Sequence, residues 1–168
     1  MRAAGIILAV AAALALQSTL ERYIRGSVAL DLVLVVVVYV ALTCGPVTGL
    51  LTGTFGGLVQ DAMGTGVIGI GGLAKTLIGF LAGIIGTQFI VAQPLPRFVV
   101  FFGATLLERL VFIGLYVMLN LRQFESPYAA VFGQAAANAT VGVLVFQMVE
   151  LLPGAVERRR AAKGRVHR

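Results

Sequence analysis

The sequence predicts an all-α integral membrane protein that folds as a compact bundle of six transmembrane helices. Hydrophobic residues make up 59% of the 168 residues, whereas charged residues make up only 12%. The mean hydropathy of the chain is +0.98. A soluble domain carries roughly 25% charged residues, because its surface is in contact with water. We therefore expect no soluble domain of any size.

Six apolar segments define the expected membrane domain, which covers residues 1–157. A spanning helix needs about 20 residues, within a range of roughly 17 to 25. Helices are the default in lipid, because every backbone amide there must be paired internally. The third segment is short, which suits a tilted, re-entrant or protein-covered helix. The expected helices cover residues 3–20, 28–44, 46–60, 67–92, 98–119 and 129–152.

The prolines support these limits. Proline costs about 3 kcal/mol or more inside a helix, so it is expected at helix starts and in loops. In this chain the prolines lie at the boundaries of the expected segments, namely at Pro46, Pro94, Pro96, Pro127 and Pro153.

The distribution of lysine and arginine predicts the orientation. With the N-terminus inside, the cytoplasmic side holds Arg2, Arg97 and the six basic residues of a tail at 158–168. Three basic residues then remain for the outer side, namely Arg22, Arg25 and Arg122. Because cytoplasmic loops are enriched in lysine and arginine, both termini are expected in the cytoplasm. The tail is expected to face anionic lipid and not nucleic acid.

A ladder of glycines is the strongest local pattern. Gly45, Gly49, Gly53 and Gly57 recur every four residues, and Asp61 continues the spacing. Residues four apart share one helix face, and glycines on such a face let another helix approach closely in a membrane. The ladder therefore predicts either a crossing inside the bundle or a docking face for another protein. A second pair with this spacing is Gly79 and Gly83.

Asp61 lies in a glycine-rich turn between the third and fourth segments. A carboxylate just before a helix is favoured by the positive end of the helix dipole. We expect Asp61 to play this structural role, with ligand or proton handling as the alternative.

Lys75, Glu108 and Arg109 are charges inside expected membrane helices. Each costs roughly 3 kcal/mol near the bilayer centre, so each is expected to face protein or water. Lys75 and Glu108 reach similar depths from opposite directions, which predicts an ion pair. With Glu108 paired to Lys75, Arg109 has no obvious acidic partner at its depth, so backbone carbonyls, Asn138 or a partner's helix are its expected acceptors.

The sequence offers no chemistry for an enzyme. Its one cysteine, Cys44, permits no disulfide within the chain and no thiolate metal site. Its one histidine, His167, lies in the tail, which argues against a histidine metal site or a catalytic dyad. No P-loop, nucleophile elbow or dinucleotide-binding context is present. We expect no catalytic activity, no metal and no cofactor.

The stretch from Gly49 to Gly83 resembles the rod shape-determining protein MreD family. Members of that family have a glycine-rich helix that ends in a Gly-Leu-Leu-x-Asp-like element, a short turn, and a helix that closes on Gly-Tyr/Phe-Leu-x-Gly. Here Gly57-Leu-Val-Gln-Asp61 and Gly79-Phe-Leu-Ala-Gly83 stand in those places. The motif covers about 35 residues, and the remainder of the chain matches in length and organisation.

This resemblance implies a non-enzymatic scaffold in the bacterial inner membrane that supports cell elongation, rod shape and peptidoglycan synthesis. The implied direct partner is an MreC-like protein, which crosses the membrane once and carries a periplasmic coiled coil. RodA, a class B penicillin-binding protein and MreB filaments are implied as indirect partners. The family also looks similar in architecture to the substrate-binding subunits of energy-coupling-factor transporters.

That likeness supplies an alternative function, the substrate-binding membrane subunit of a vitamin-type uptake transporter. Such a subunit is expected to have a polar or aromatic pocket near its outer loops. The chain has no tryptophan and four tyrosines. The few candidate pocket residues are Tyr23, Asp61, Glu125 and Tyr128. A membrane enzyme is a third class, and no cluster of residues supports it.

Overall fold

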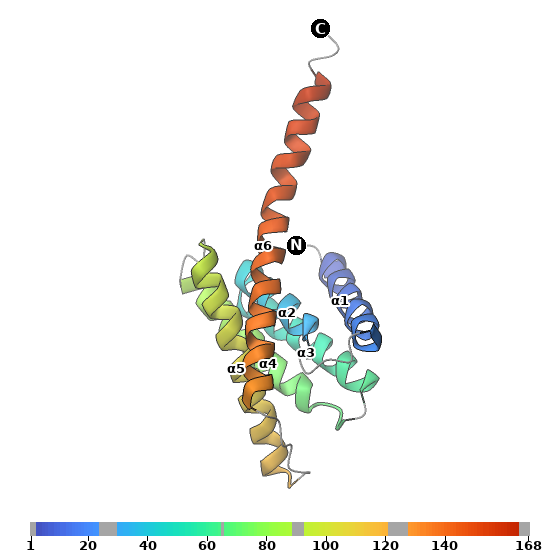
Figure 1. The fold of residues 1–168 in the computed structure, drawn as a ribbon, viewed down its shortest axis with the longest axis vertical. Coiled ribbons are helices and arrows are strands. Elements are labelled where there is room, and N and C mark those ends of the chain that lie inside the picture. The colour runs from blue at the N-terminus through green and yellow to red at the C-terminus, as the bar shows by residue number, and fades with distance from the viewer. Residues whose placement is uncertain (1–2, 24–29, 65, 89–92, 121–127, 165–168) are drawn as a thin grey trace.

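The computed structural model describes residues 3–23, 30–64, 66–88, 93–120 and 128–164, and every regular element in this part of the chain is a helix (Figure 1). The expectation of an all-α protein is therefore confirmed. The helices are α1 (Ala3–Tyr23), α2 (Leu32–Cys44), α3 (Pro46–Met63), α4 (Ile70–Gln88), α5 (Pro94–Met118) and α6 (Tyr128–Gly164).

Several helix ends differ from the expected ones. The helix expected over 28–44 begins only at Leu32, because the Asp31 side chain accepts a hydrogen bond from the Leu34 N–H and caps it. Helix α5 begins at Pro94, four residues early, since proline fits the first turn of a helix. The expected end of the last helix at 152 is wrong, because α6 continues to Gly164 through Pro153. Residues 155–163 are mostly alanine, arginine, glutamate and lysine, which favour helix.

Four helices are long and apolar enough to cross a membrane by length and composition: α1, α4, α5 and the part of α6 from Tyr128 to Leu151. Helix α2 is apolar but has only 13 residues. A helix of that length extends about 20 Å, less than the hydrocarbon core of roughly 30 Å. The fold is thus that of a helical membrane protein with one short apolar helix.

Helix α2 forms the centre of the bundle. It contacts each of the other five helices, and valines fill most of its length from Val33 to Val40. A helix that is apolar on all sides is normally buried, and all but two of the residues from Leu32 to Ala41 are buried here. Leu34, Val38 and Ala41 pack with Ile78 of α4 and with Phe101 and Phe146 of α5 and α6.

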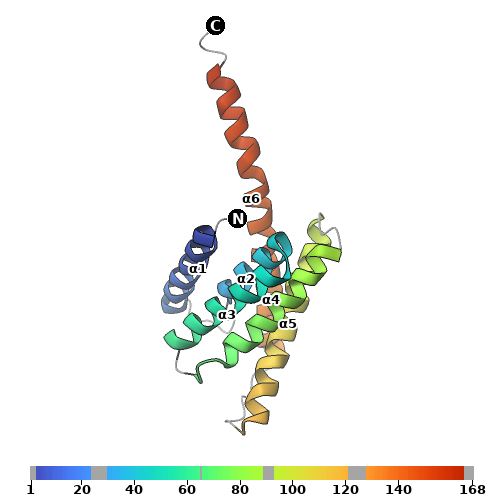
Figure 2. The same ribbon diagram turned by 180° about the vertical axis from the view of Figure 1, so that it is seen from behind.

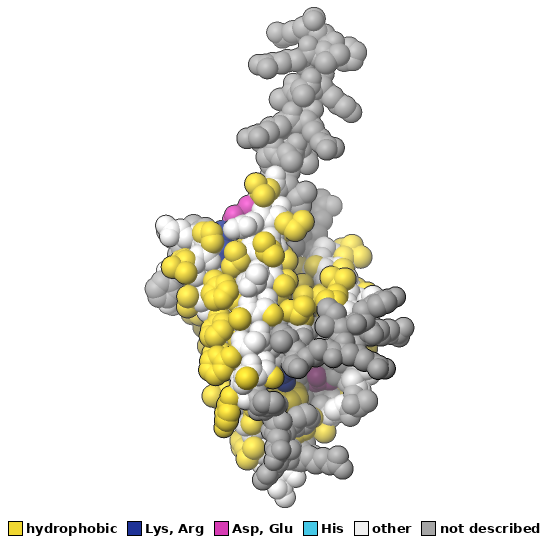
Figure 3. All heavy atoms as spheres, viewed as in Figure 1, with side chains coloured by type: hydrophobic (Ala, Val, Ile, Leu, Met, Phe, Trp, Pro, Cys, Tyr) yellow, Lys and Arg dark blue, Asp and Glu magenta, His cyan; other side chains and the backbone are white. Residues whose placement is uncertain are grey.

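Helices α3 and α4 form an antiparallel hairpin with the most extensive helix contact in the described chain, and Figure 2 shows them side by side. Helix α1 is attached more loosely, to α2 and α3, with Val10 and Ala13 as its buried residues. Helices α5 and α6 cover the opposite side, where apolar side chains dominate the outer surface (Figure 3). Large exposed apolar residues such as Val99, Phe132 and Leu144 belong to this surface.

Candidate functional site

A cluster of buried charges joins three helices of the bundle. The Lys75 Nζ atom of α4 lies 2.8 Å from Oδ2 of Asp31 and 3.1 Å from Oε1 of Glu108. The relative exposure of Asp31 is 7%, and that of Lys75 and Glu108 is 4% each. The contact expected between Lys75 and Glu108 is therefore present, but the ammonium group also binds a second carboxylate.

Asp31 belongs to this cluster because α2 is short. The carboxylate stands immediately before Leu32, and its Oδ1 accepts the Leu34 N–H at 2.9 Å. Helix α2 begins at the level of Lys75 and Glu108, inside the bundle, and its first turn brings the Asp31 carboxylate to them. Sequence reasoning missed this residue, although an aspartate directly before an apolar run is a recognised start signal for a helix.

Side chains from two other helices complete the N-terminus of α2. Asn138 Oδ1 accepts the Asp31 N–H at 3.0 Å, and Gln17 Oε1 of α1 accepts the Leu32 N–H at 3.2 Å. Asn138 is fully buried, and its Nδ2 donates to Thr105 Oγ1 at 3.4 Å. The first backbone donors of a helix have no partner within the helix, so these side chains replace the solvent that would otherwise satisfy them.

Arg109 occupies the edge of this cluster. Its Nε donates to Gln134 Oε1 at 2.9 Å, and its Cζ lies 6.0 Å from the centre of the Phe112 ring. The expectation that Asn138 could accept from Arg109 is wrong, because Asn138 is engaged with α2. Gln134 lies one turn earlier on α6, on the same face, and takes that role.

The glycine ladder serves two different purposes. Gly45 joins α2 to α3 with a φ of 90°, a backbone conformation that favours glycine. The other three ladder glycines lie where α3 touches the backbone of α4: a Cβ at Gly57 would lie 2.6 Å from the Gly72 Cα, and one at Gly53 would meet the carbonyl carbon of Lys75 at the same distance. Three of the four ladder glycines therefore form a close crossing between two helices of the same chain.

The second glycine pair lies on the facing side of that crossing. A Cβ at Gly79 would collide with the backbone of Gly49, and one at Gly83 with the backbone of Pro46. Side chains larger than hydrogen at these two positions would separate the helices at the end of the contact where α3 begins. The close crossing therefore depends on glycines of both α3 and α4.

Asp61 lies in the last turn of α3 and contacts the start of α4. Its Oδ2 accepts the Gly69 N–H at 2.8 Å and the Gly72 N–H at 3.0 Å. Gly69 has a φ of 106°, which suits the sharp turn into α4. The carboxylate thus satisfies backbone donors at the positive end of α4, as expected for the structural role.

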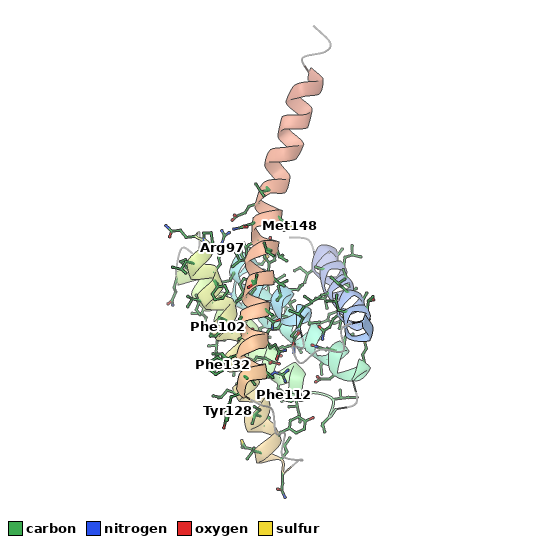
Figure 4. All side chains as sticks on the ribbon, viewed as in Figure 1. Arg97, Phe102, Phe112, Tyr128, Phe132 and Met148 are labelled. Atoms are coloured by element: carbon green, nitrogen blue, oxygen red, sulfur yellow. The ribbon has the colours of Figure 1, made fainter. Side chains whose placement is uncertain are left out.

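A second ion pair joins α5 to α6 at the other end of the bundle. Arg97 donates to both carboxylate oxygens of Glu150, with Nη1 at 2.9 Å from Oε2, and its Cζ lies 4.4 Å from the centre of the Phe146 ring. Arg97 is buried, and Figure 4 shows it beside the upper part of α6. The sequence placed Arg97 in a loop, whereas the structure places it in the first turn of α5.

The residues considered for an outer-face ligand pocket are only partly described. Glu125 and the side chain of Tyr23 lie outside the described residues. Tyr128 is 86% exposed at the start of α6, and Asp61 is engaged with α4. Within the described ranges, no group of three or more histidine, cysteine, aspartate or glutamate side chains could hold a metal ion.

The comparisons with known proteins give one match. The model of the family described as rod shape-determining protein MreD matches residues 4–154, which cover most of the 168-residue chain and include part or all of each of the six helices. No curated protein and no solved structure matches the chain. Because the family match spans far more than half of the sequence, the chain belongs to the MreD family, whose role is rod shape determination.

Proposed function

We propose that this protein is a non-enzymatic scaffold of the bacterial cell-elongation machinery, embedded in the inner membrane, that binds an MreC-like partner and so supports peptidoglycan synthesis. The observation that carries the proposal is the self-contained polar cluster at the N-terminus of α2. Asp31, Lys75, Glu108 and Asn138 satisfy one another inside the bundle. Because these polar groups pair with one another, they stabilise the helix bundle. Binding of a partner protein is then left to the outer helix faces.

The alternative of a vitamin-type uptake subunit receives less support from the same cluster. In membrane transporters, an anionic substrate group often binds at the N-terminus of a helix that starts within the membrane. Helix α2 starts in this way, but the chain's own Asp31 carboxylate occupies its first turn, and Gln17 and Asn138 accept its first N–H groups. A substrate would have to displace groups that already neutralise Lys75. The likeness to energy-coupling-factor subunits stays a prediction about architecture.

We further propose that all six helices lie in the membrane, with both termini in the cytoplasm. Helices α2 and α3 fall short of the criteria for independent spans, yet α2 is enclosed by the other five helices. Such an arrangement shields the short helix from lipid. The orientation follows from the excess of basic residues on the N- and C-terminal side.

Within this scheme the MreC-like protein is the direct partner, and RodA, a class B penicillin-binding protein and MreB are reached through it. The basic residues after 157 are proposed to lie at the cytoplasmic surface, where anionic lipid attracts positive charge. The exposed apolar residues of α3 and α4, such as Leu51, Phe55, Leu73 and Leu77, leave one side of the hairpin available to lipid or to a partner helix.

Purification in mild detergent together with the native membrane partners tests the proposal. We expect a stoichiometric complex with an MreC-like protein, identified by mass spectrometry, and loss of rod shape when the protein is depleted. Co-purification with ATPase subunits and a bound vitamin would instead establish the transporter alternative. Reporter fusions placed within residues 24–29, within residues 121–127 and at the C-terminus test the proposed orientation, and a periplasmic C-terminus would contradict it.

A further inference from the structure

Arg109 uses only part of its hydrogen-bonding capacity inside the bundle. A guanidinium group carries five N–H donors, and the Nε of Arg109 donates to Gln134. The two terminal nitrogens donate to no acceptor in the part of the chain that the structure describes. The side chain is only partly buried, so these donors reach the surface of the described bundle. Phe112, one turn further along α5, has its ring below the Arg109 guanidinium.

Among the described residues, the two carboxylates of the buried cluster form no hydrogen bond with Arg109. Asp31 and Glu108 share the Lys75 ammonium group, and neither hydrogen-bonds to Arg109. Arg109 therefore differs from Lys75 and from Arg97, which bind carboxylates directly. A guanidinium fork with open terminal donors matches the two oxygens of a carboxylate in particular.

The depth of Arg109 decides which kind of acceptor can reach it. Helix α5 runs from Pro94 to Met118, and Arg109 lies nine residues before its end, which corresponds to about 13 Å along the axis. A charge at that depth is expected to face protein or water. A side-chain carboxylate on a neighbouring membrane helix is a protein acceptor that can reach it.

We propose that the terminal nitrogens of Arg109 bind a side-chain carboxylate on the transmembrane helix of a partner protein that docks beside α5. This inference rests on the proposed function, because it names the contact through which the scaffold holds its membrane partner. Apolar residues on the outer side of α5 would pack against the same helix, namely Leu110, Ile113 and Val117, all of which are exposed. Charged side chains inside membranes commonly mark such functional contacts.

Substitution of Arg109 tests the contact directly. The probe is the full-length MreC-like protein of the same organism, reconstituted in nanodiscs with the full-length chain. We expect Arg109→Gln to weaken binding by about 30-fold or more, as when one partner of a buried charge pair is truncated. The matched control Leu8→Ala truncates an exposed leucine of α1, outside the proposed docking face, and keeps the guanidinium, so its binding should stay within about threefold of the wild type.

Substitution of Gln134 separates docking from packing inside the bundle. Gln134→Ala removes the internal acceptor of Arg109 but leaves both terminal nitrogens in place, so partner binding should persist. If Gln134→Ala weakens binding as much as Arg109→Gln, Arg109 acts within the bundle and the inference is overturned. Equal binding by the wild type and Arg109→Gln also overturns it, while leaving the proposed scaffold function intact. Absence of binding by the wild type refutes the proposed function itself.

A cross-linking measurement covers the case in which Arg109→Gln fails to fold. A photoreactive residue at Ile113, one turn beyond Arg109 on the same face of α5, should cross-link to the membrane helix of the partner. The same probe at the exposed Leu73 of α4 serves as the control and should give little product. Cross-linking from position 73 alone, or from neither position, would place the partner elsewhere and overturn the inference.

Discussion

Removal of the Lys75 charge should be among the most damaging single changes to the bundle. Lys75→Met leaves the Asp31 and Glu108 carboxylates without their shared cation, 2.8 Å and 3.1 Å from where the ammonium group stood. Breaking a buried pair by removing one partner costs about 3–5 kcal/mol, because an uncompensated charge stays buried. Two carboxylates are stranded here, so we expect a loss at the upper end of that range.

The second carboxylate changes the outcome of a simple double-mutant test. With Lys75 and Glu108 as an isolated pair, Lys75→Met combined with Glu108→Gln would restore stability. In this structure the double variant still leaves the Asp31 carboxylate buried and unpaired, so it should recover only part of the loss. The triple variant with Asp31→Asn removes every charge of the cluster, and asparagine still caps a helix. It should come within about 2 kcal/mol of the wild type, because a buried ion cluster adds little net stability over neutral groups.

Thermal unfolding of the purified protein in detergent, followed by fluorescence-detected size exclusion, measures this series. The expected order of stability is wild type first, then the triple variant, then the double variant, and Lys75→Met last. Single variants Asp31→Asn and Glu108→Gln each keep one ion pair and should lie above Lys75→Met. A triple variant no more stable than Lys75→Met would refute the three-residue cluster.

Three further changes probe the rest of the framework with the same unfolding assay. Gly53→Ala forces a methyl group against the α4 backbone and should cost about 1–3 kcal/mol, whereas Gly103→Ala meets open space and should be neutral or stabilising by up to about 1 kcal/mol. Asp61→Ala removes the acceptor for two N–H groups at the start of α4 and should cost about 0.5–2 kcal/mol; an unchanged melting curve would contradict that role. Asn138→Ala leaves the Asp31 N–H buried without its acceptor and should cost about 1–3 kcal/mol, whereas Thr140→Ala, exposed on the same helix, should have little effect.

The glycine ladder shows how far a local pattern can be interpreted. The four-residue spacing predicted a close helix contact, and the structure shows that contact between α3 and α4 for Gly49, Gly53 and Gly57. The same spacing at Gly45 reflects a turn and not a contact, because a repeat in sequence does not reveal where a helix begins. Whether the outer side of this hairpin also binds a partner is a question about a second molecule, which no pattern within one chain can answer.

The sequence by itself determined the class of the protein and the positions of its apolar helices, because a long apolar run in lipid must satisfy its backbone internally and therefore folds as a helix. It also predicted that Lys75 and Glu108 share a depth, since depth follows from counting residues along a helix. Only the tertiary structure decided that Asp31 joins the two charges, and that Gln134 rather than Asn138 accepts from Arg109. These features depend on how far each helix is rotated and which helices are neighbours, and such relations are set by side-chain packing between segments far apart in the sequence.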